Sequence, residues 1–467
     1  MTKQQVDRAE LAQAELGAVD LGDARLTKRL HRVAGLLAKK PGESFPDALG
    51  GAAELEGLYR LLGNERVTPH AILAPHAELT TQRCGDVGRV LAIFDSTKAR
   101  FGGERKGLGR LTGKKGRGVY VHVGLMLDGA TREPLGIIHH ETWARQGPKK
   151  KRRDARGQDD SEALRWDRGV EAVFEQLPGA VCVMDREADI FPLIAGMMQR
   201  RQDFVIRVSH DRATAEGLLW DLVDGAELVT TREVTLDERK ARTREPEQKL
   251  HPARLAHKAT LHIRTRRVTI LAPSSNRNPT IRAKADRVAI NLIHVIEHNT
   301  PKGCSPIEWK LFTSLPAETA ADVDEVVDIY RARWVIEELF KALKSCCSLE
   351  ERQLESVHSV SNAIAISLPI AWIILRLRHL SRDDPNRPAT GLISPFMIVC
   401  LRLLVAQLGR KPLPAEPTCK ELTWAIAGLG GHITNNGEPG LLVLNRGLAK
   451  LLAATDVAAM VKTAWDL

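Results

Sequence analysis

Hydrophobic and polar positions along the chain divide it into a helical beginning, a central part of mixed pattern and a helical end. Between Asp23 and Lys40 the apolar residues recur three or four positions apart, which predicts an amphipathic helix with Asp23 as its N-cap. The opposite face of that helix is basic and carries Lys28, Arg32 and Lys39. A second short stripe follows, and Pro69 opens a third helical stretch, so residues 1–70 are expected to form a small helical domain.

The pattern changes to strands after residue 89. Three apolar runs of strand length, at 90–94, 119–127 and 134–143, precede a helix capped near Ser161, a buried strand at 180–184, a short helix and a strand at 204–208. A Gly-rich basic loop separates the first two runs. The order β-β-β-α-β-α-β is typical of a mixed sheet in which a right-handed crossover lays the fourth strand parallel to the first.

Two aspartates follow the strands that this crossover brings together. Asp95 comes directly after the first strand, which Ser96 and Thr97 are expected to end in a turn, and Asp185 comes directly after the fourth. Since these two strand ends lie at the same edge of the sheet, we expect the two carboxylates to meet there. Turn formation or N-capping is the common role of either aspartate taken alone.

The remaining pattern sets the domain boundaries. Residues 215–318 carry alternating β-like runs between basic and Pro/Asn-rich stretches, which predicts a β-rich insertion. A long helix from about Ala320 to Ser345 then completes the core, and the chain beyond about residue 382 is mostly helical. The expected domains are residues 1–70, residues 71–381 with the insertion, and residues 382–467.

Four polar residues share one side of the helix predicted at 320–345. At 100° per residue, Tyr330, Arg333, Glu337 and Lys344 lie within about 60° of each other, beside an apolar stripe that would pack on the sheet. A carboxylate at this border can meet groups from the sheet edge. Each residue also has an ordinary explanation, because Glu337 can pair with Lys341 and the basic residues can be solvated.

Composition bears on the partner and on the setting of the protein. Lys and Arg number 68 against 58 Asp and Glu, and this net charge of +10 favours a polyanionic partner, with a basic surface that binds nothing as the alternative. The seven cysteines include no C-x-x-C pair, which argues against a disulfide framework and a structural zinc site. The longest apolar run, residues 363–375, is too short and too interrupted to span a membrane, so a cytoplasmic location is expected.

Three carboxylates from three separate elements favour divalent-metal chemistry. Mg²⁺ prefers a few carboxylate oxygens together with water and substrate phosphate. Two such ions about 4 Å apart can activate an attacking water or hydroxyl and stabilise the leaving oxygen in phosphodiester cleavage. The candidates are Asp95, Asp185 and Glu337, while Glu187 and Asp189 compete with Asp185 on residue type alone.

Three motifs carry a resemblance to a known family. The spacing Tyr330-x2-Arg333-x3-Glu337-x6-Lys344 is that of the YREK signature, and it occurs together with Asp95-Ser96-Thr97 and with the segment 185–190, Asp-Arg-Glu-Ala-Asp-Ile. With these motifs the chain resembles bacterial cut-and-paste DDE transposases of the insertion-sequence type. The similarity extends from residues 21–25 through 351–353 to 424–431.

The resemblance implies both a fold and a site. The fold would be an α/β RNase H-like mixed-sheet core interrupted by a β-rich insertion, with an N-terminal helical end-recognition domain and a C-terminal helical dimerisation region. Asp95, Asp185 and Glu337 would bind two Mg²⁺ ions, for which Mn²⁺ can substitute. The residues expected to contact DNA are Tyr330, Arg333, Lys344 and Arg207 near the cut, Trp309 as the stacking partner of an extruded base, and Arg25, Lys28, Arg29 and Arg32 on the N-terminal helix.

Two positions qualify these assignments. A core Trp on a strand is the alternative for Trp309. Ser209 stands where the family pattern often has Lys, which would weaken one phosphate contact, and the C-terminal region lacks the Lys/Arg-rich linker seen in relatives.

The functional hypothesis is a Mg²⁺-dependent DNA transposase that acts as a homodimer on two transposon ends. It would nick one strand, form a hairpin at the end, and transfer the reopened end into target DNA. A catalytically silent, DNA-binding and dimerising relative is the first alternative, against which the intact triad argues. A metal-dependent hydrolase of another substrate is the second, against which the basic N-terminal helix and the basic loop argue.

Overall fold

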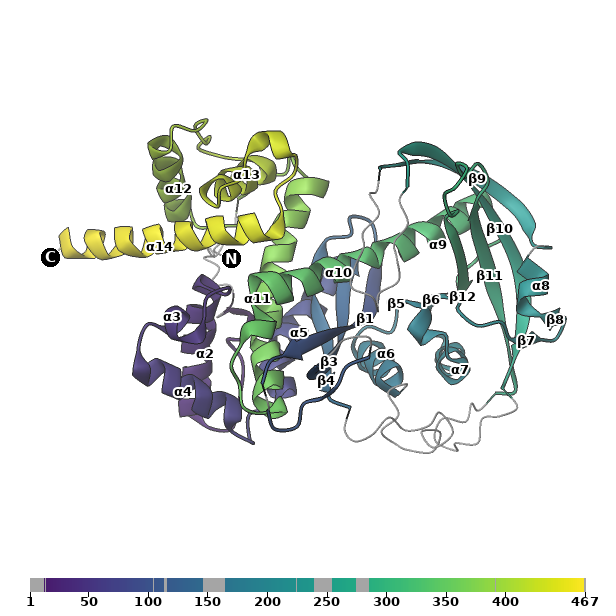
Figure 1. Ribbon diagram of the computed structural model, residues 1–467, viewed down its shortest axis with the longest axis horizontal. Helices are drawn as coiled ribbons and strands as arrows, with labels where there is room; N and C mark the ends of the chain where they lie inside the picture. Colours follow the sequence, from purple (N-terminus) through teal and green to yellow (C-terminus); the bar gives the residue numbers. More distant parts are fainter. Residues whose placement is uncertain are drawn as a thin grey trace.

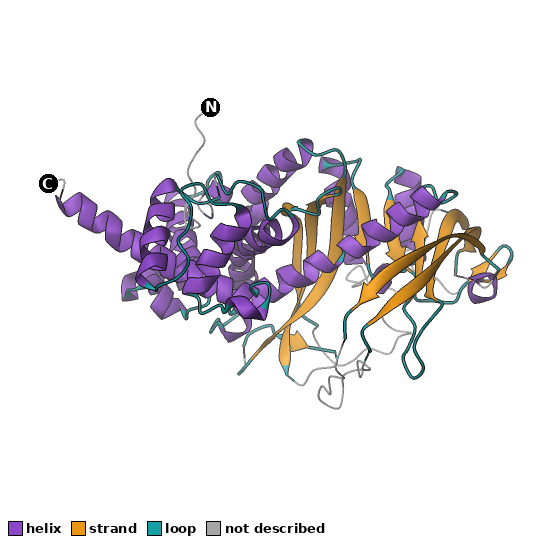
Figure 2. Cartoon of the chain, turned by 90° about the horizontal axis from the view of Figure 1, so that it is seen from above, coloured by secondary structure: helices purple, strands orange, loops and turns teal. Residues whose placement is uncertain are grey.

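The computed structural model describes residues 12, 14–103, 105–112, 116–145, 164–223, 225–238, 254–273, 285–390 and 392–465. Helices from both ends of the chain gather on one side of the molecule, and a long twisted sheet occupies the other (Figure 1, Figure 2). A helical rod, formed by α9 (Ala320–Ala332) and α10 (Trp334–Lys341), runs between the two sides (Figure 1).

The N-terminal region is helical, as the pattern predicts. Its helices are α2 (Ala24–Lys39), α3 (Phe45–Leu49), α4 (Ala52–Gly63) and α5 (Pro69–Gly85). Asp23 caps α2 by accepting a hydrogen bond from the Arg25 amide at 2.8 Å, and the apolar stripe of α2 is buried. The expected helix and its cap are therefore confirmed.

A mixed sheet forms the centre of the fold. Its first strands are β1 (Val90–Phe101), β2 (Gly109–Arg110), β3 (Arg117–Asp128), β4 (Pro134–Trp143), β5 (Val181–Met184) and β6 (Phe204–Arg207). The strand order is β2-β3-β1-β5-β6, with β4 paired to β3. Strand β5 runs parallel to β1, which confirms the predicted crossover.

The β-rich insertion continues this sheet. It consists of β7 (Ala213–Thr214), β8 (Gly217–Leu218), α8 (Leu219–Val223), β9 (Glu227–Leu236), β10 (His257–Leu271), β11 (Arg287–Glu297) and β12 (Glu308–Thr313). Strand β12 pairs antiparallel with β6, so the described strands form one 12-stranded sheet. This pairing brings the insertion next to the edge at which β5 ends.

Helices cover both faces of the sheet. The helices α6 (Leu164–Gln176) and α7 (Phe191–Arg200) share a hydrophobic core with the even-numbered residues of β1 between 90 and 94. The helices α9 (Ala320–Ala332) and α10 (Trp334–Lys341) share the other core with the odd-numbered residues. Side chains that follow each other along β1 therefore face different helices. The predicted cap of α6 near Ser161 lies outside the described residues.

The helix predicted from Ala320 to Ser345 is present with one interruption. Arg333 separates α9 from α10, and a single π-helical turn, Ala342–Cys346, ends the rod. The extra residue in such a turn rotates the residues that follow it relative to a regular helix.

The C-terminal part is helical as expected, with α11 (Val357–Asp383), α12 (Pro395–Gln407), α13 (Cys419–Leu429) and α14 (Leu441–Trp465). Among the described helices, α11 alone is long and apolar enough to cross a membrane, but 89% of its most apolar stretch is buried inside the fold. It is the central core helix, between α4, α5 and β4 (Figure 1). The last turns of α14 extend away from the body.

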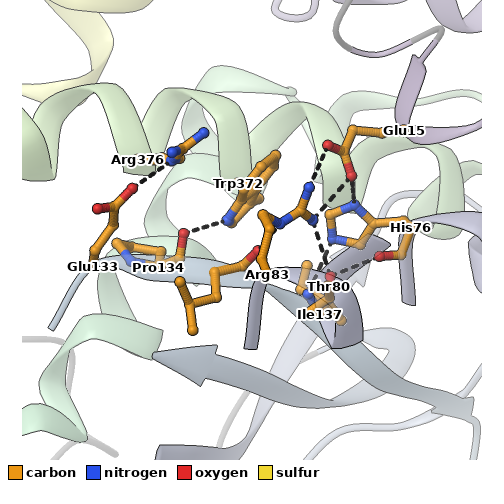
Figure 3. A network of polar contacts seen from close by, with 10 residues as sticks. Glu15, His76, Thr80, Arg83, Glu133, Pro134, Ile137, Trp372 and Arg376 are labelled. Atoms are coloured by element: carbon orange, nitrogen blue, oxygen red, sulfur yellow. Dashed lines mark hydrogen bonds and ion pairs between the residues drawn. The ribbon is translucent and has the colours of Figure 1, made fainter. Parts of the chain in front are cut away.

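A buried polar network fixes the N-terminal segment to this core (Figure 3). Glu15 contacts Nδ1 of His76 at 2.5 Å and accepts a hydrogen bond from Arg83 at 2.8 Å. His76 Nε2 accepts a hydrogen bond from the Ile137 amide of β4, and its ring packs edge-on against Trp372 of α11. The charge of Glu15 is thus paired within the fold, as a buried carboxylate requires.

Candidate active site

Asp95 and Asp185 are neighbours in the sheet. The last parallel pair between β1 and β5 is Phe94 with Met184, and the two aspartates are the residues that follow these two along the chain. The prediction that Ser96 and Thr97 end the first strand is wrong, because β1 continues to Phe101. The reason is that β3 pairs with β1 along its whole length, whereas β5 has only four residues.

Asp95 lies in a partly enclosed position with 17% of its side chain exposed. Its Oδ2 accepts a hydrogen bond from Nη1 of Arg333 at 2.8 Å. Burial and the nearby charge of Asp185 raise the pKa of Asp95 to about 7, and Arg333 opposes this shift. The charge of Glu337 raises the pKa of Asp95 further, so both other carboxylates repel the ionised form of Asp95.

Glu337 joins the same group through Arg333. Nη2 of Arg333 donates to Oε1 of Glu337 at 2.9 Å, which is an i, i+4 contact across the interruption between α9 and α10. The Glu337 side chain is 44% exposed. Arg333 thus lies between two carboxylates and donates to both. Among the described contacts, the ion pair of Glu337 is with Arg333 and not with Lys341, the partner that helical spacing also allowed.

Asp185 turns away from β5 into a short 3-10 turn, Arg186–Ala188, which it caps by accepting a hydrogen bond from the Glu187 amide at 2.8 Å. Tyr330 lies near Asp185. Burial raises the pKa of the Tyr330 phenol, and the negative charge of Asp185 raises it further, whereas the positive charges of Arg333 and Arg207 lower it.

Lys344 and Thr97 make a further link between the rod and β1. Nζ of Lys344 donates to Oγ1 of Thr97 at 2.6 Å. Thr97 lies two residues beyond Asp95 on the same strand face. The structure therefore brings Arg333, Glu337 and Lys344 to the face of β1 that carries Asp95. The role of the Thr97 hydroxyl was not visible in the sequence, where Thr97 reads as a turn residue.

Trp309 and Arg207 lie at the border of the same area. The Trp309 ring, which is partly buried, packs edge-on against Tyr330 with 5.4 Å between ring centroids. Arg207 donates to the Glu308 carbonyl at 3.2 Å, and its positive charge lies near the Tyr330 phenol. Trp309 is thus in contact with the tyrosine of the four-residue helix pattern, as well as with the core.

The competing acids have other partners. Asp189 is buried, forms an ion pair with Arg212, and accepts hydrogen bonds from the amides of Ser209 and His210. Glu187 pairs with Arg165 at 2.8 Å. These contacts hold the segment after β5, and they favour Asp185 over both rivals.

The donor set fits a hard divalent cation. Asp95, Asp185 and Glu337 offer carboxylate oxygens, and a cation would stabilise the ionised form of Asp95, whose pKa is raised first by burial and then by the charge of Asp185. In the described part of the chain, no three acidic, histidine or cysteine side chains are yet gathered closely enough to ligate one ion. Arg333 occupies the position between Asp95 and Glu337, as their present counter-charge.

The basic residues of α2 lie on its exposed face. Lys28 is exposed, Arg25 pairs with its own cap Asp23, and Arg32 pairs with Glu54 of α4 at 2.7 Å. The Arg29 guanidinium lies so close over Gly57 of α4 that a side chain there would collide with it. The four residues form one accessible basic surface.

The mixed sheet with its parallel crossover, its acidic edge and its β-rich insertion defines an RNase H-like core, flanked by an N-terminal and a C-terminal helical region. Residues 87–373, well over half of the chain, match the family model described as transposase DDE domain. Residues 8–67 match the model described as transposase DNA-binding. The chain therefore belongs to the DDE transposase family, whose members generally use divalent metal ions, and DNA is its partner.

A similar solved structure is the cryo-EM structure of the piggyBac transposase synaptic complex with hairpin DNA. The two chains share 10% sequence identity with a TM-score of 0.41, over 90% of this chain and 79% of that one.

Proposed function

We propose that this transposase excises a DNA element by nicking each end, closing each end as a hairpin, and joining the reopened ends to target DNA. The observation that carries the proposal is the pairing of Asp95 and Glu337 with one arginine, Arg333, beside the point where β5 ends and Asp185 follows. Its setting would be chromosomal DNA in a bacterial cytoplasm.

Asp95, Asp185 and Glu337 would hold two Mg²⁺ ions, or Mn²⁺ in their place. When bound, these ions supply a nucleophile by lowering the pKa of water and stabilise the charge on the leaving oxygen. The carboxylates must be ionised to bind them, so protonation of Asp95, whose pKa is raised, would compete with metal binding as the pH falls.

The cationic side chains around the acids would hold the DNA backbone. Arg333 can present a planar fork of donors to a phosphate. Lys344 presents a point charge beside Thr97, which lies two residues from Asp95 along β1. Tyr330 and Arg207 extend this row of donors toward Trp309. Together they would fix the scissile phosphate against the three carboxylates.

Hairpin closure requires a sharp bend that stacked bases resist. An extruded base costs a few kcal/mol, of which stacking on an aromatic ring offsets roughly 1–3 kcal/mol. Trp309 lies at the edge of the donor row and is only partly buried, so it can offer such a surface.

Cutting two ends in one complex calls for two active sites, for which a two-fold dimer is the commonest arrangement. The last turns of α14 carry Val457, Met460 and Val461, exposed apolar residues at helical spacing. We propose that this stripe packs against a second copy when two ends are paired.

The experiment that tests this function uses DNA. The protein is incubated with duplexes that end in the sequences flanking its own gene, with Mg²⁺, and the nicked, hairpin and excised products are separated on a denaturing gel. Time-ordered appearance of the three products supports the proposal. Binding of the ends without any cleavage would instead identify a catalytically silent, DNA-binding relative.

A further inference from the structure

The residue after Asp95 is held from the far side of the sheet. Asp95 belongs to the face of β1 that contacts α9 and α10, and it meets Arg333 there. Ser96 points to the other face, toward α6. Contacts to Ser96 can therefore determine where the Asp95 backbone lies without touching anything bound at the acidic site.

One arginine of α6 connects the two aspartate segments. Nε of Arg165 donates to Oγ of Ser96 at 3.2 Å, and its Nη2 donates to Oε2 of Glu187 at 2.8 Å. The amide of Glu187 in turn donates to Oδ1 of Asp185 at 2.8 Å. A single guanidinium thus spans from the neighbour of Asp95 to the turn that Asp185 caps.

The arginine itself is rigidly held. Arg165 is 7% exposed, and its guanidinium carbon lies 5.2 Å from the ring centroid of Trp143 and 5.1 Å from that of Trp166. Two indoles fix the plane of the fork, so its donors are preorganised toward Ser96 and Glu187.

The Ser96 hydroxyl is also fixed from the neighbouring strand. His122 is paired directly with Ser96 across β1 and β3, and its Nδ1 lies 2.9 Å from Oγ. His122 is fully buried, and burial lowers its pKa well below the ordinary value, so the ring stays neutral. Ser96 is therefore held between a neutral imidazole and a guanidinium.

Simple stabilisation is a poor account of the Arg165 contacts. The Glu187 side chain is 63% exposed, and an ion pair with such a partner typically contributes less than about 1 kcal/mol. Burying the guanidinium opposes that gain. What the geometry does provide is a link between β1 and the turn after β5 beyond their last backbone pair, Phe94 with Met184, where the described contacts include no direct side-chain link between Asp95 and Asp185.

We infer that Arg165 is a positioning residue, which sets the separation of Asp95 and Asp185 by joining Ser96 to Glu187 behind the acidic site. The inference rests on the proposed function, because it assigns a purpose to the spacing of two proposed metal ligands. Partners of metal-ligating carboxylates typically contribute 10- to 100-fold to metal affinity or activity.

The test measures Mn²⁺ binding to the full chain without DNA, by electron paramagnetic resonance, beside a thermal melt. Arg165→Lys keeps the charge but cannot reach both acceptors, and Ser96→Ala removes one of them. Each variant is expected to bind Mn²⁺ about tenfold more weakly than the wild type. The double variant should be no weaker than the weaker single variant, because both changes break the same link. Ser96→Ala carries the test if Arg165→Lys does not fold.

Two further variants separate the possible outcomes. Arg168→Lys, on the same helix and paired with Glu141 at 2.9 Å, changes an arginine outside the link and should bind Mn²⁺ like the wild type. Asp95→Asn should lose binding. If Asp95→Asn loses binding while well-folded Arg165→Lys and Ser96→Ala bind normally, the positioning role is wrong. If Asp95→Asn binds normally, the proposed metal site is wrong.

Discussion

Nη1 of Arg333 donates to Oδ2 of Asp95 at 2.8 Å, although the two residues lie 238 positions apart in the sequence. This contact joins the helical rod to β1, and the same guanidinium also binds Glu337. Metal ligands must be deprotonated, and a cation bound here would replace the counter-charge that Arg333 now supplies. Arg333 would then be free to bind a phosphate.

The raised pKa of Asp95 leads to a pH-dependent stability. Its pKa rises from 3.8 to about 7 on folding, so the folded chain binds more protons than the unfolded chain between these values. The metal-free protein therefore loses stability as pH rises through this window, by at most about 4 kcal/mol. Asp95→Asn should melt several degrees above the wild type at pH 8 in EDTA, and the difference should narrow at pH 5, because it closes only below the unfolded pKa of 3.8.

A residue of opposite sign provides the control. Asp322 belongs to the capping box of α9, and hydrogen bonds from Thr319 hold its pKa below the ordinary value. Asp322→Asn should lower the melting temperature at pH 8, with a smaller effect in acid. An Asp95→Asn variant that melts like the wild type at both pH values would contradict the assigned environment of Asp95.

Trp309→Phe and Trp309→Ala should separate hairpin formation from nicking. The alanine variant should nick normally and accumulate nicked ends, and the phenylalanine variant should recover part of the hairpin yield because it keeps an aromatic face. If Trp309 serves only the core, the alanine variant should melt lower and lose every step equally, since removing a buried Trp costs about 3–5 kcal/mol. Timed product analysis beside a melt distinguishes these results.

The exposed basic face of α2 predicts a change in salt dependence. Lys28→Glu or Arg32→Glu should weaken end binding and reduce the slope of log affinity against log salt by about one unit for each lost phosphate contact. Lys411→Glu, an exposed change between α12 and α13, should leave the slope unaltered. If Lys28→Glu, Arg32→Glu and Lys411→Glu all keep the wild-type slope, the α2 face is only solvated.

The end of α14 predicts a defect in pairing. Replacing Val457, Met460 and Val461 by Gln should leave single-end binding intact and remove paired-end complexes from native gels. Ala459→Gln changes the opposite side of the helix and should keep the pairing. Deletion from residue 440 is a poorer test, because Leu444, Leu448 and Leu451 belong to the C-terminal core.

Periodicity was sufficient to predict most of the elements. The strand at 134–143 and the helix cap at Asp23 are found as expected, because alternation and capping chemistry are local signals. The meeting of Asp95 with Asp185 followed from the handedness of one crossover. The clustering of Arg333, Glu337 and Lys344 followed from helical spacing, even though Arg333 interrupts the helix.

What the pattern could not predict depends on contacts between distant segments. The extension of β1 beyond Asp95 arises from pairing with β3, while Ser96 and Thr97 locally favour a turn. Arg165 carries no sequence signal, because a single arginine on an amphipathic helix is usually solvated. Its role emerges only once α6 lies against the even-numbered face of β1.

The most direct test of the central claim is strand nicking at a labelled end duplex with Mg²⁺ by Asp95→Asn, Asp185→Asn and Glu337→Gln. Glu338→Gln serves as the control, since Glu338 follows Glu337 on α10 but pairs with Arg378 and Arg382. The account predicts that the first three variants bind the end within a few-fold of the wild type and produce no nick with Mg²⁺ or Mn²⁺, while Glu338→Gln cleaves normally. Nicking at the wild-type rate by any of the three would contradict it.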